Sequence, residues 1–128
     1  MRASRLPTGE TDDLFEMANL SPALTGLPMI VWISERGHAR HDARVKVSLG
    51  HGRRARPDRT ASVSVRPTVE IVAGPELDRR DMGLVRQWIE LNREAILAYW
   101  NGDLLTDEVI ARLQPVPTPA RSGEAPDQ

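Results

Sequence analysis

A single amphipathic stretch, residues 77–102, constrains the fold of this chain more than any other part of the sequence. Wound at about 100° per residue, it collects large apolar side chains on one side and Arg, Gln and Glu on the other. The apolar side holds two of the three Trp residues and the only Tyr of the chain. The pattern predicts one long helix covering a core. The apolar side consists of Leu84, Val85, Trp88, Ile89, Leu91, Ala95, Ile96, Tyr99 and Trp100.

Both ends of this helix carry terminal signals. Asp78, with Asp81 three residues later, is typical of an N-cap with its capping box. Leu77 and Met82 flank the two acids as a hydrophobic staple does. At the other end, Gly102 is the residue expected where a helix closes through a left-handed position. We therefore expect the helix to begin after Asp78 and to end just before Gly102.

One polar residue interrupts the apolar side. Asn92 lies between Trp88 and Tyr99 on the helical wheel, where its amide is expected to be buried. A buried amide needs hydrogen-bond partners. We expect Asn92 to pin the helix to a strand edge or to loop backbone; the alternative is that it faces a protein partner.

Four short segments before the helix have strand character. Residues 29–33 form a continuous, β-branched apolar run, typical of a strand buried on both faces. Residues 44–49 and 62–65 alternate between apolar and polar, which predicts one inward and one outward face. Residues 69–72 predict an edge strand. The inward set of the second segment is Val45, Val47 and Leu49, and the outward face would carry Arg44, Lys46, Ser48, Ser62, Ser64 and Arg66.

This order of elements predicts an α+β fold. A small antiparallel sheet of three to four strands would carry the long C-terminal helix on one face, followed by a short second helix. Thr106 is the expected N-cap of that second helix. Residues 21–114 would form the single domain, with a flexible extension over 1–20 and a disordered tail over 115–128.

Composition bounds the biology. The chain has no Cys, so disulfides and thiolate chemistry are excluded. No apolar run approaches the ~20 residues of a membrane span, so a cytoplasmic protein without a membrane partner is expected. The net charge of −1 is unevenly distributed, because residues 36–66 hold eight Arg and one Lys against two Asp, a net charge of +7. A basic middle segment suggests a polyanion or an acidic protein as partner.

The basic segment also contains the only candidates for a metal site. His38, His41 and Asp42, with His51 nearby, supply potential ligands. Their spacing matches no established zinc pattern, and neighbouring Arg residues repel a cation. No nucleophile has an orienting acid and base in a known motif. We therefore predict no metal, no cofactor and no catalytic residue.

The basic residues form the stronger functional signal. We expect them to make one exposed binding surface able to grip phosphates or acidic side chains. The outward sheet face is expected to lack aromatics, which argues against base stacking, and no helix is basic along one side. The alternative is a solvated Arg-rich hairpin. The candidate surface consists of Arg40, Arg44, Lys46, Arg53, Arg54 and Arg56.

The segments RVKVSLG, ASVSV and WIELNREAILAYWNG resemble small bacterial domains of unknown function with the pattern RVKV, SVSI and WI..NRE.LL.YW.G. Those domains are similar to a larger uncharacterised family marked by a Pro-Pro-His-Phe-His stretch, which here reads Gly-His-Ala-Arg-His at 37–41. Both Pro and the Phe are missing, so no role for these His is carried over. The resemblance covers 28–113 and implies an association with toxin–antitoxin systems without implying an activity. It marks Trp88, Asn92, Tyr99 and Trp100 as signature residues.

The sequence therefore predicts a small non-enzymatic interaction module of a regulatory system. Its expected partner is a protein, as for an antitoxin-type component, and a homodimer stays open. The alternative is a nucleic-acid-binding protein acting through residues 36–66. A metal-dependent hydrolase ranks third.

Overall fold

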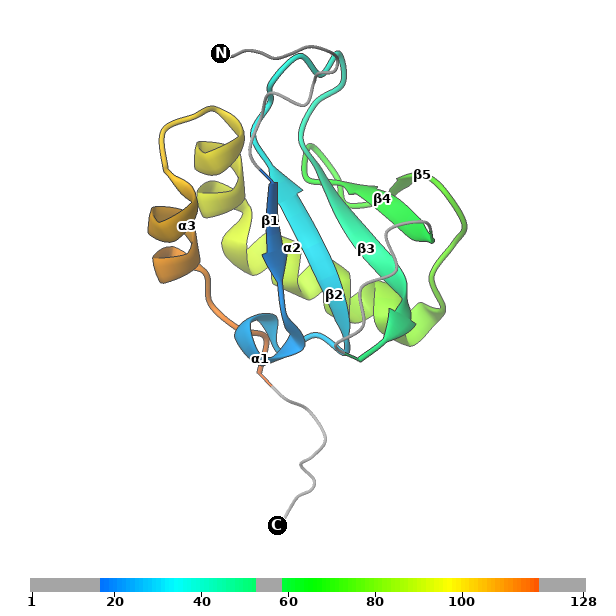
Figure 1. Ribbon diagram of the computed structural model, residues 1–128. Coiled ribbons are helices and arrows are strands. Elements are labelled where there is room, and N and C mark those ends of the chain that lie inside the picture. The colour runs from blue at the N-terminus through cyan, green and yellow to red at the C-terminus, as the bar shows by residue number, and fades with distance from the viewer. Residues whose placement is uncertain (1–16, 53–58, 118–128) are drawn as a thin grey trace, which may run out of the picture.

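The computed structural model describes residues 17–52 and 59–117. Its architecture is α+β, as predicted: a five-stranded antiparallel sheet in the order β1-β2-β3-β4-β5, with α2 crossing one face (Figure 1). The elements are β1 (Met17–Leu20), α1 (Pro22–Thr25), β2 (Met29–Ser34), β3 (Arg44–His51), β4 (Thr60–Ser64), β5 (Ile71–Ala73), α2 (Arg79–Trp100) and α3 (Thr106–Arg112).

The sheet has one more strand than the three to four expected, because β1 pairs with β2 along its whole length. Ala18 and Leu20 of β1 are buried, so the strand alternates like an edge strand packed on a core. At the other end, the Val116 N–H donates to the Thr25 carbonyl over 2.8 Å, and Val116 is buried. The ordered fold therefore extends beyond both predicted boundaries, 21 and 114.

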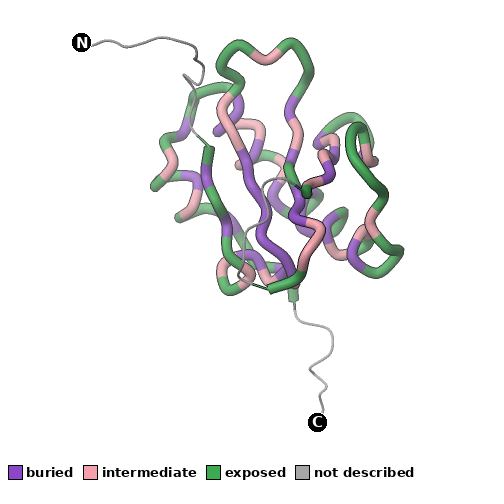
Figure 2. The backbone as a smooth tube through the Cα atoms, turned by 45° about the vertical axis from the view of Figure 1, so that its right-hand side comes forward, coloured by how far each residue is buried: buried purple, intermediate pink, exposed green. Residues whose placement is uncertain are grey.

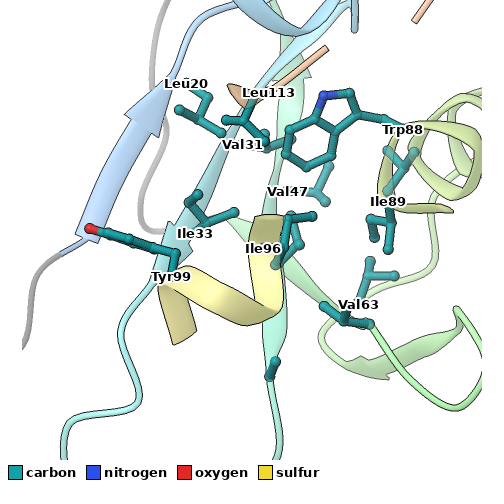
Figure 3. Packing of buried hydrophobic residues seen from close by; sticks show 14 of the residues in the cluster. Leu20, Val31, Ile33, Val47, Val63, Trp88, Ile89, Ile96, Tyr99 and Leu113 are labelled. Atoms are coloured by element: carbon teal, nitrogen blue, oxygen red, sulfur yellow. The ribbon is translucent and has the colours of Figure 1, made fainter. Parts of the chain in front are cut away.

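The core lies between α2 and the inner face of the sheet (Figure 3). Val31 of β2 pairs with Val47 of β3, and Val63 of β4 extends the same apolar layer. Trp88 and Ile96 of α2 pack against this layer. All five side chains are buried, so the three central strands are held by one continuous apolar contact.

The predicted ends of α2 are confirmed. The Asp78 side chain accepts a hydrogen bond from the Asp81 N–H at 2.8 Å, and Gly102 has φ +83°, a left-handed conformation that glycine adopts without strain. The predicted face is wrong at Leu91, which is 43% exposed.

The N-cap predicted for the second helix is one residue off. Helix α3 begins at Thr106, so Leu105 occupies the cap position. The Leu105 N–H donates instead to the Glu108 carboxylate at 2.8 Å, and the Thr106 and Tyr99 hydroxyls share a hydrogen bond of 2.8 Å. Thr106 therefore ties α3 to α2 through the hydrogen bond between its hydroxyl and that of Tyr99.

The strand predicted over 69–72 appears as β5, two residues later at Ile71–Ala73. Strand β2 is buried on both faces, as predicted (Figure 2). In β3 the predicted alternation fails after Val47: Ser48 is buried and Leu49 only half-buried. The cause is an irregularity in the β2–β3 pairing: between the pairs Val31–Val47 and Met29–His51, one residue of β2 lies opposite three residues of β3.

Candidate binding recess on the outer face of the sheet

The outer face of the sheet, opposite α2, has no helix over it among the described residues (Figure 1). Strand pairing places Trp32 of β2, Lys46 of β3 and Ser62 of β4 in one row across this face. The expectation that this face lacks aromatics is therefore wrong. Trp32 was hidden in a run that reads as buried on both sides, although it points away from Val31 and Ile33.

A recess of about 120 Å³ opens on this face, between the strands and the loop that joins β2 to β3. Its aromatic lining comes from Trp32, His41 and Trp100. Its charged lining comes from the three cations Arg36, Arg44 and Lys46 and from one carboxylate, Glu35. Trp32 and Trp100 are only 6% and 5% exposed, so they form the deep part, whereas His41, Arg36 and Lys46 are exposed at the rim.

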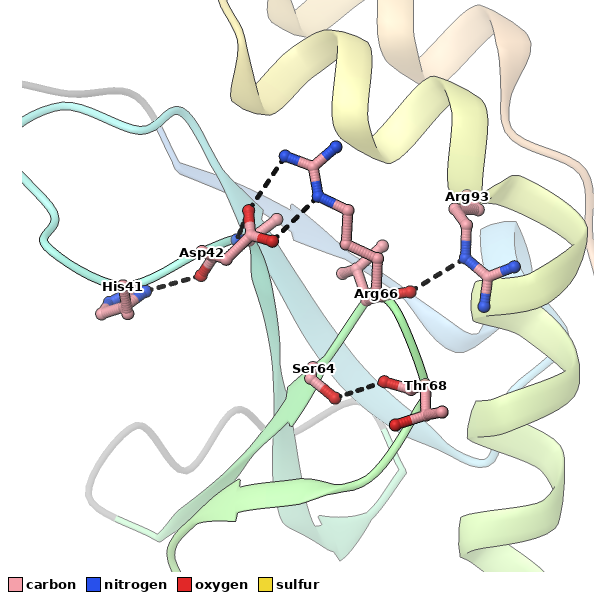
Figure 4. Close-up of polar contacts among 8 residues, drawn as sticks. His41, Asp42, Ser64, Arg66, Thr68 and Arg93 are labelled. Carbon is pink, nitrogen blue, oxygen red and sulfur yellow. Dashed lines mark hydrogen bonds and ion pairs between the residues drawn. The ribbon is translucent and has the colours of Figure 1, made fainter.

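The β2–β3 loop is docked against the last turn of α2, which explains how Trp100 reaches the recess. The Arg36 N–H donates to the Trp100 carbonyl at 2.9 Å. The His41 ring stacks on Trp100 with centroids 5.8 Å apart and an interplanar angle of 28°. His41 Nδ1 donates to the Asp42 carbonyl at 2.7 Å, which leaves Nε2 of the neutral ring as an acceptor (Figure 4).

The end of this loop is held by an ion pair. Arg66 donates from Nε and Nη2 to the two carboxylate oxygens of Asp42, at 2.8 and 3.0 Å (Figure 4). These hydrogen bonds, with a weaker contribution from the Ala43 N–H, hold the pKa of Asp42 below its usual value, and the same pair raises the pKa of Arg66. Asp42 therefore stays ionised, and its negative charge is paired with Arg66 and not with the cations of the recess.

The part of the chain that the structure describes gives the cations of the recess no such partner. Within 17–52 and 59–117, the ion pairs are Asp42 with Arg66 and His51 with Asp81, and none involves Arg36, Arg44 or Lys46. Among the described residues, three cations without ion-pair partners and one carboxylate, Glu35, line the recess beside two largely buried aromatic rings, so its charged lining is positive on balance. The recess is therefore suited to hold an anionic group next to a planar or apolar one.

The predicted basic surface is only partly described. Arg40 and Lys46 are exposed, and Arg44 is half-buried. Arg44 and Lys46 line the recess. Arg53, Arg54 and Arg56 lie outside the described residues. Sequence reasoning missed Arg36, His41, Trp32 and Trp100 as members of the site. The alternation of side chains along residues 29–33 could have predicted Trp32, because it places Trp32 on the opposite face from Val31 and Ile33, which is the outer face that also carries Lys46.

A family model described as DUF4160, a domain of unknown function, matches residues 38–101. This chain belongs to the DUF4160 family. The DUF4160 match runs from the β2–β3 loop to the residue after α2, so it includes His41, Arg44, Lys46 and Trp100, whereas Trp32 and Arg36 precede it. Comparisons with curated proteins and with solved structures gave no match.

Asn92 and Arg93, both inside the DUF4160 match, tie the fold together. Asn92, 3% exposed, donates from Nδ2 to the Gln114 and Trp88 carbonyls and accepts from the Gln114 N–H. This confirms the expected pinning to loop backbone. Arg93 donates from Nε to the Val65 carbonyl at 2.9 Å (Figure 4). Trp88 and Tyr99 lie in the core, so of the predicted signature residues only Trp100 lines the recess.

The histidines are dispersed. His41 precedes β3 and stacks on Trp100, whereas His51 ends β3 and its Nε2 lies 2.6 Å from Asp81 Oδ2. His38 is exposed in the loop. Over the described part of the chain, no three potential ligand side chains converge on one point. The described helices also include none long and apolar enough to cross a membrane.

Proposed function

We propose that this DUF4160 protein is a non-enzymatic binding module whose recess captures an acidic partner. The observation that supports the proposal is the group Arg36, Arg44 and Lys46, cations without carboxylate partners in the described chain, around two largely buried tryptophans. We further propose that the module belongs to a small bacterial regulatory system of the toxin–antitoxin kind, which the sequence resemblance alone supports. A cytoplasmic location is proposed from the lack of a long apolar run in the sequence.

The composition of the recess matches the chemistry of binding hot spots. Trp and Arg are enriched among residues that contribute most to binding, because they bury large surfaces and form directed hydrogen bonds. Charges at the rim attract and orient an oppositely charged partner. His41 and the hydroxyls of Ser34 and Ser62 add polar groups to the same lining without forming a nucleophile–base–acid set.

The proposal is tested by reversing two recess charges. The double variant Arg44→Glu/Lys46→Glu is compared with Arg79→Glu/Arg80→Glu, which makes the same charge change on exposed residues in the first turn of α2. Binding to heparin and to polyglutamate is measured at about 50 mM and 200 mM salt. We expect wild type to bind at least one polyanion at low salt, the recess variant to lose at least about tenfold, and the α2 variant to lose far less.

Two results would contradict the proposal. Wild-type protein that binds neither polyanion at low salt would remove it. Equal losses in the two double variants would show that binding follows net charge and not the recess.

A further inference from the structure

We infer that the recess accepts one base of a single-stranded nucleic acid, with the neighbouring phosphates over Arg36, Arg44 and Lys46. This inference rests on the proposed function and names its partner. It follows from three properties that meet at the recess: its size, its aromatic depth and its cationic rim.

The size of the recess fits one aromatic ring. Its volume is about 120 Å³, somewhat less than the ~150 Å³ of an enclosed apolar cavity that holds a benzene molecule, so a ring would enter it in part. Because the recess is open to solvent, a six-membered ring can enter while its sugar and phosphates stay outside. Trp32 and Trp100 offer such a ring aromatic contacts at the floor of the recess through the small part of each side chain that is exposed, and contacts with aromatic rings do not depend on base identity.

The cations are placed for a chain of phosphates. Arg44 and Lys46 point to the same side of β3, two residues apart, a separation of about 6.8 Å along an extended strand. Arg36 approaches from the β2–β3 loop. A backbone lying along β3 can therefore place phosphates near cations on both sides of the inserted base.

Polar groups for the edge of a base are also present. The Ser34 and Ser62 hydroxyls line the recess and can each donate or accept a hydrogen bond. His41 contributes an acceptor, because its Nδ1 donates to the Asp42 carbonyl and its Nε2 stays unprotonated in the neutral ring. These groups are adaptable, so we expect weak preference among bases.

A duplex and an acidic peptide fit less well. Bases in a duplex are stacked and paired, and entry into a recess requires that they be flipped out. An acidic peptide can pair its carboxylates with the cations. Unlike a nucleic acid, it does not carry an aromatic ring beside each negative charge. Both serve as comparison ligands.

The test measures fluorescence anisotropy of labelled strands of about ten nucleotides with wild-type protein at one low salt concentration. The ligands are oligo(U), oligo(dT), an abasic strand of equal phosphate number, a matched duplex and, as competitor, polyglutamate. We expect one or both base-bearing strands to bind about tenfold more tightly than the abasic strand, and more tightly than the duplex. Preference for RNA or for DNA would identify the sugar and support the inference either way.

Protein variants then locate the base. Trp32→Leu should remove most of the difference between base-bearing and abasic strands, and Trp32→Phe should keep part of it by retaining a ring. Arg44→Gln/Lys46→Gln should weaken both strands by the same factor. Circular dichroism and thermal unfolding check that each variant is folded, and the abasic comparison needs no variant.

The outcomes separate the two proposals. Equal affinity for base-bearing and abasic strands, or tighter binding of the duplex or of polyglutamate, would overturn the inference and leave the proposed function standing. Failure of every polyanion to bind would remove both.

Discussion

Asn92 is a buried amide, and two of its three hydrogen bonds join α2 to the backbone of Gln114 after α3, while the third goes to the Trp88 carbonyl within α2. We predict that Asn92→Ala destabilises the protein by about 1–3 kcal/mol, because it removes two hydrogen bonds to the Gln114 backbone, each with a net contribution of about 0.5–1.5 kcal/mol. Urea unfolding measures the change, with Gln87→Ala on the exposed side of α2 as the control. A loss no larger than that of the control would show that Gln114 finds other partners.

The ion pair of Asp42 and Arg66 predicts that the stability of the fold depends on pH. Because Arg66, and secondarily the Ala43 N–H, lowers the pKa of Asp42, the folded carboxyl titrates below the unfolded one, whose pKa is about 3.9. Its stabilisation is therefore fully present above that value and is lost as the pH falls through the folded pKa. Both side chains are nearly half exposed, so the effect is small.

We expect the stability difference between wild type and Arg66→Ala to shrink as the pH falls from 7 to below about 4. In the variant, the pKa of Asp42 should rise, as followed by NMR titration of its carboxyl carbon. A stability difference that is the same at both pH values would mean that Arg66 acts through packing and not through Asp42.

For single residues, burial could be predicted from the sequence more readily than hydrogen-bond partners. The position of Asn92 on the helical wheel predicts that it is buried, and it is. Its main partner, Gln114, lies 22 residues away and depends on the path of the chain after α3, which no local pattern encodes. Thr106 is similar: local spacing suggests a cap, but the nearby Tyr99 hydroxyl takes its side chain.

At the scale of elements, α2 allows a direct comparison of two residues from its predicted apolar side. Trp88→Ala should cost about 3–5 kcal/mol, because it empties the space of a fully buried indole against the sheet. Leu91→Ala should cost less than about 1 kcal/mol, since Leu91 is largely exposed. Chemical denaturation of both variants tests the pair, and similar losses would mean that α2 is rotated on the sheet.

The error at Leu91 has a geometric cause. The buried residues of α2 span an arc of about 120° from Trp88 to Trp100, and Leu91 lies about 60° outside the Trp88 edge. Apolar character alone therefore made the predicted face too wide. In the sheet, alternation predicted β3 until Val47, beyond which irregular pairing with β2 buried Ser48. Such an irregularity depends on two strands together, so neither segment reveals it alone.

At the scale of the whole molecule, the recess combines residues from β1, β2, the β2–β3 loop, β3, β4 and the end of α2. Arg44 and Lys46 were predictable because strand alternation turns them outward. Trp100 was expected only in the apolar helix face, and its approach to His41 depends on the loop passing the end of α2. The positive charge of this region can be predicted from the sequence, whereas the contact between His41 and Trp100 depends on the tertiary fold.

The basic segment 36–66 contains further arginines besides the residues that line the recess. Arg53, Arg54 and Arg56 lie outside the described residues, and we predict that they extend the binding surface of Arg44 and Lys46. If the partner is a nucleic acid, replacing the three by Ala should weaken binding and reduce the slope of log affinity against log salt concentration by up to about three units, near one for each lost phosphate contact.

Folding should barely change in this triple variant, because exposed charges contribute little to stability. Thermal unfolding provides that control, and titrations at four or more salt concentrations provide the slope. A slope equal to that of wild type, in a protein whose recess variant Arg44→Glu/Lys46→Glu loses binding, would show that the recess acts alone. The three arginines would then be solvated charges, since phosphates that contact them would otherwise release counterions and steepen the slope.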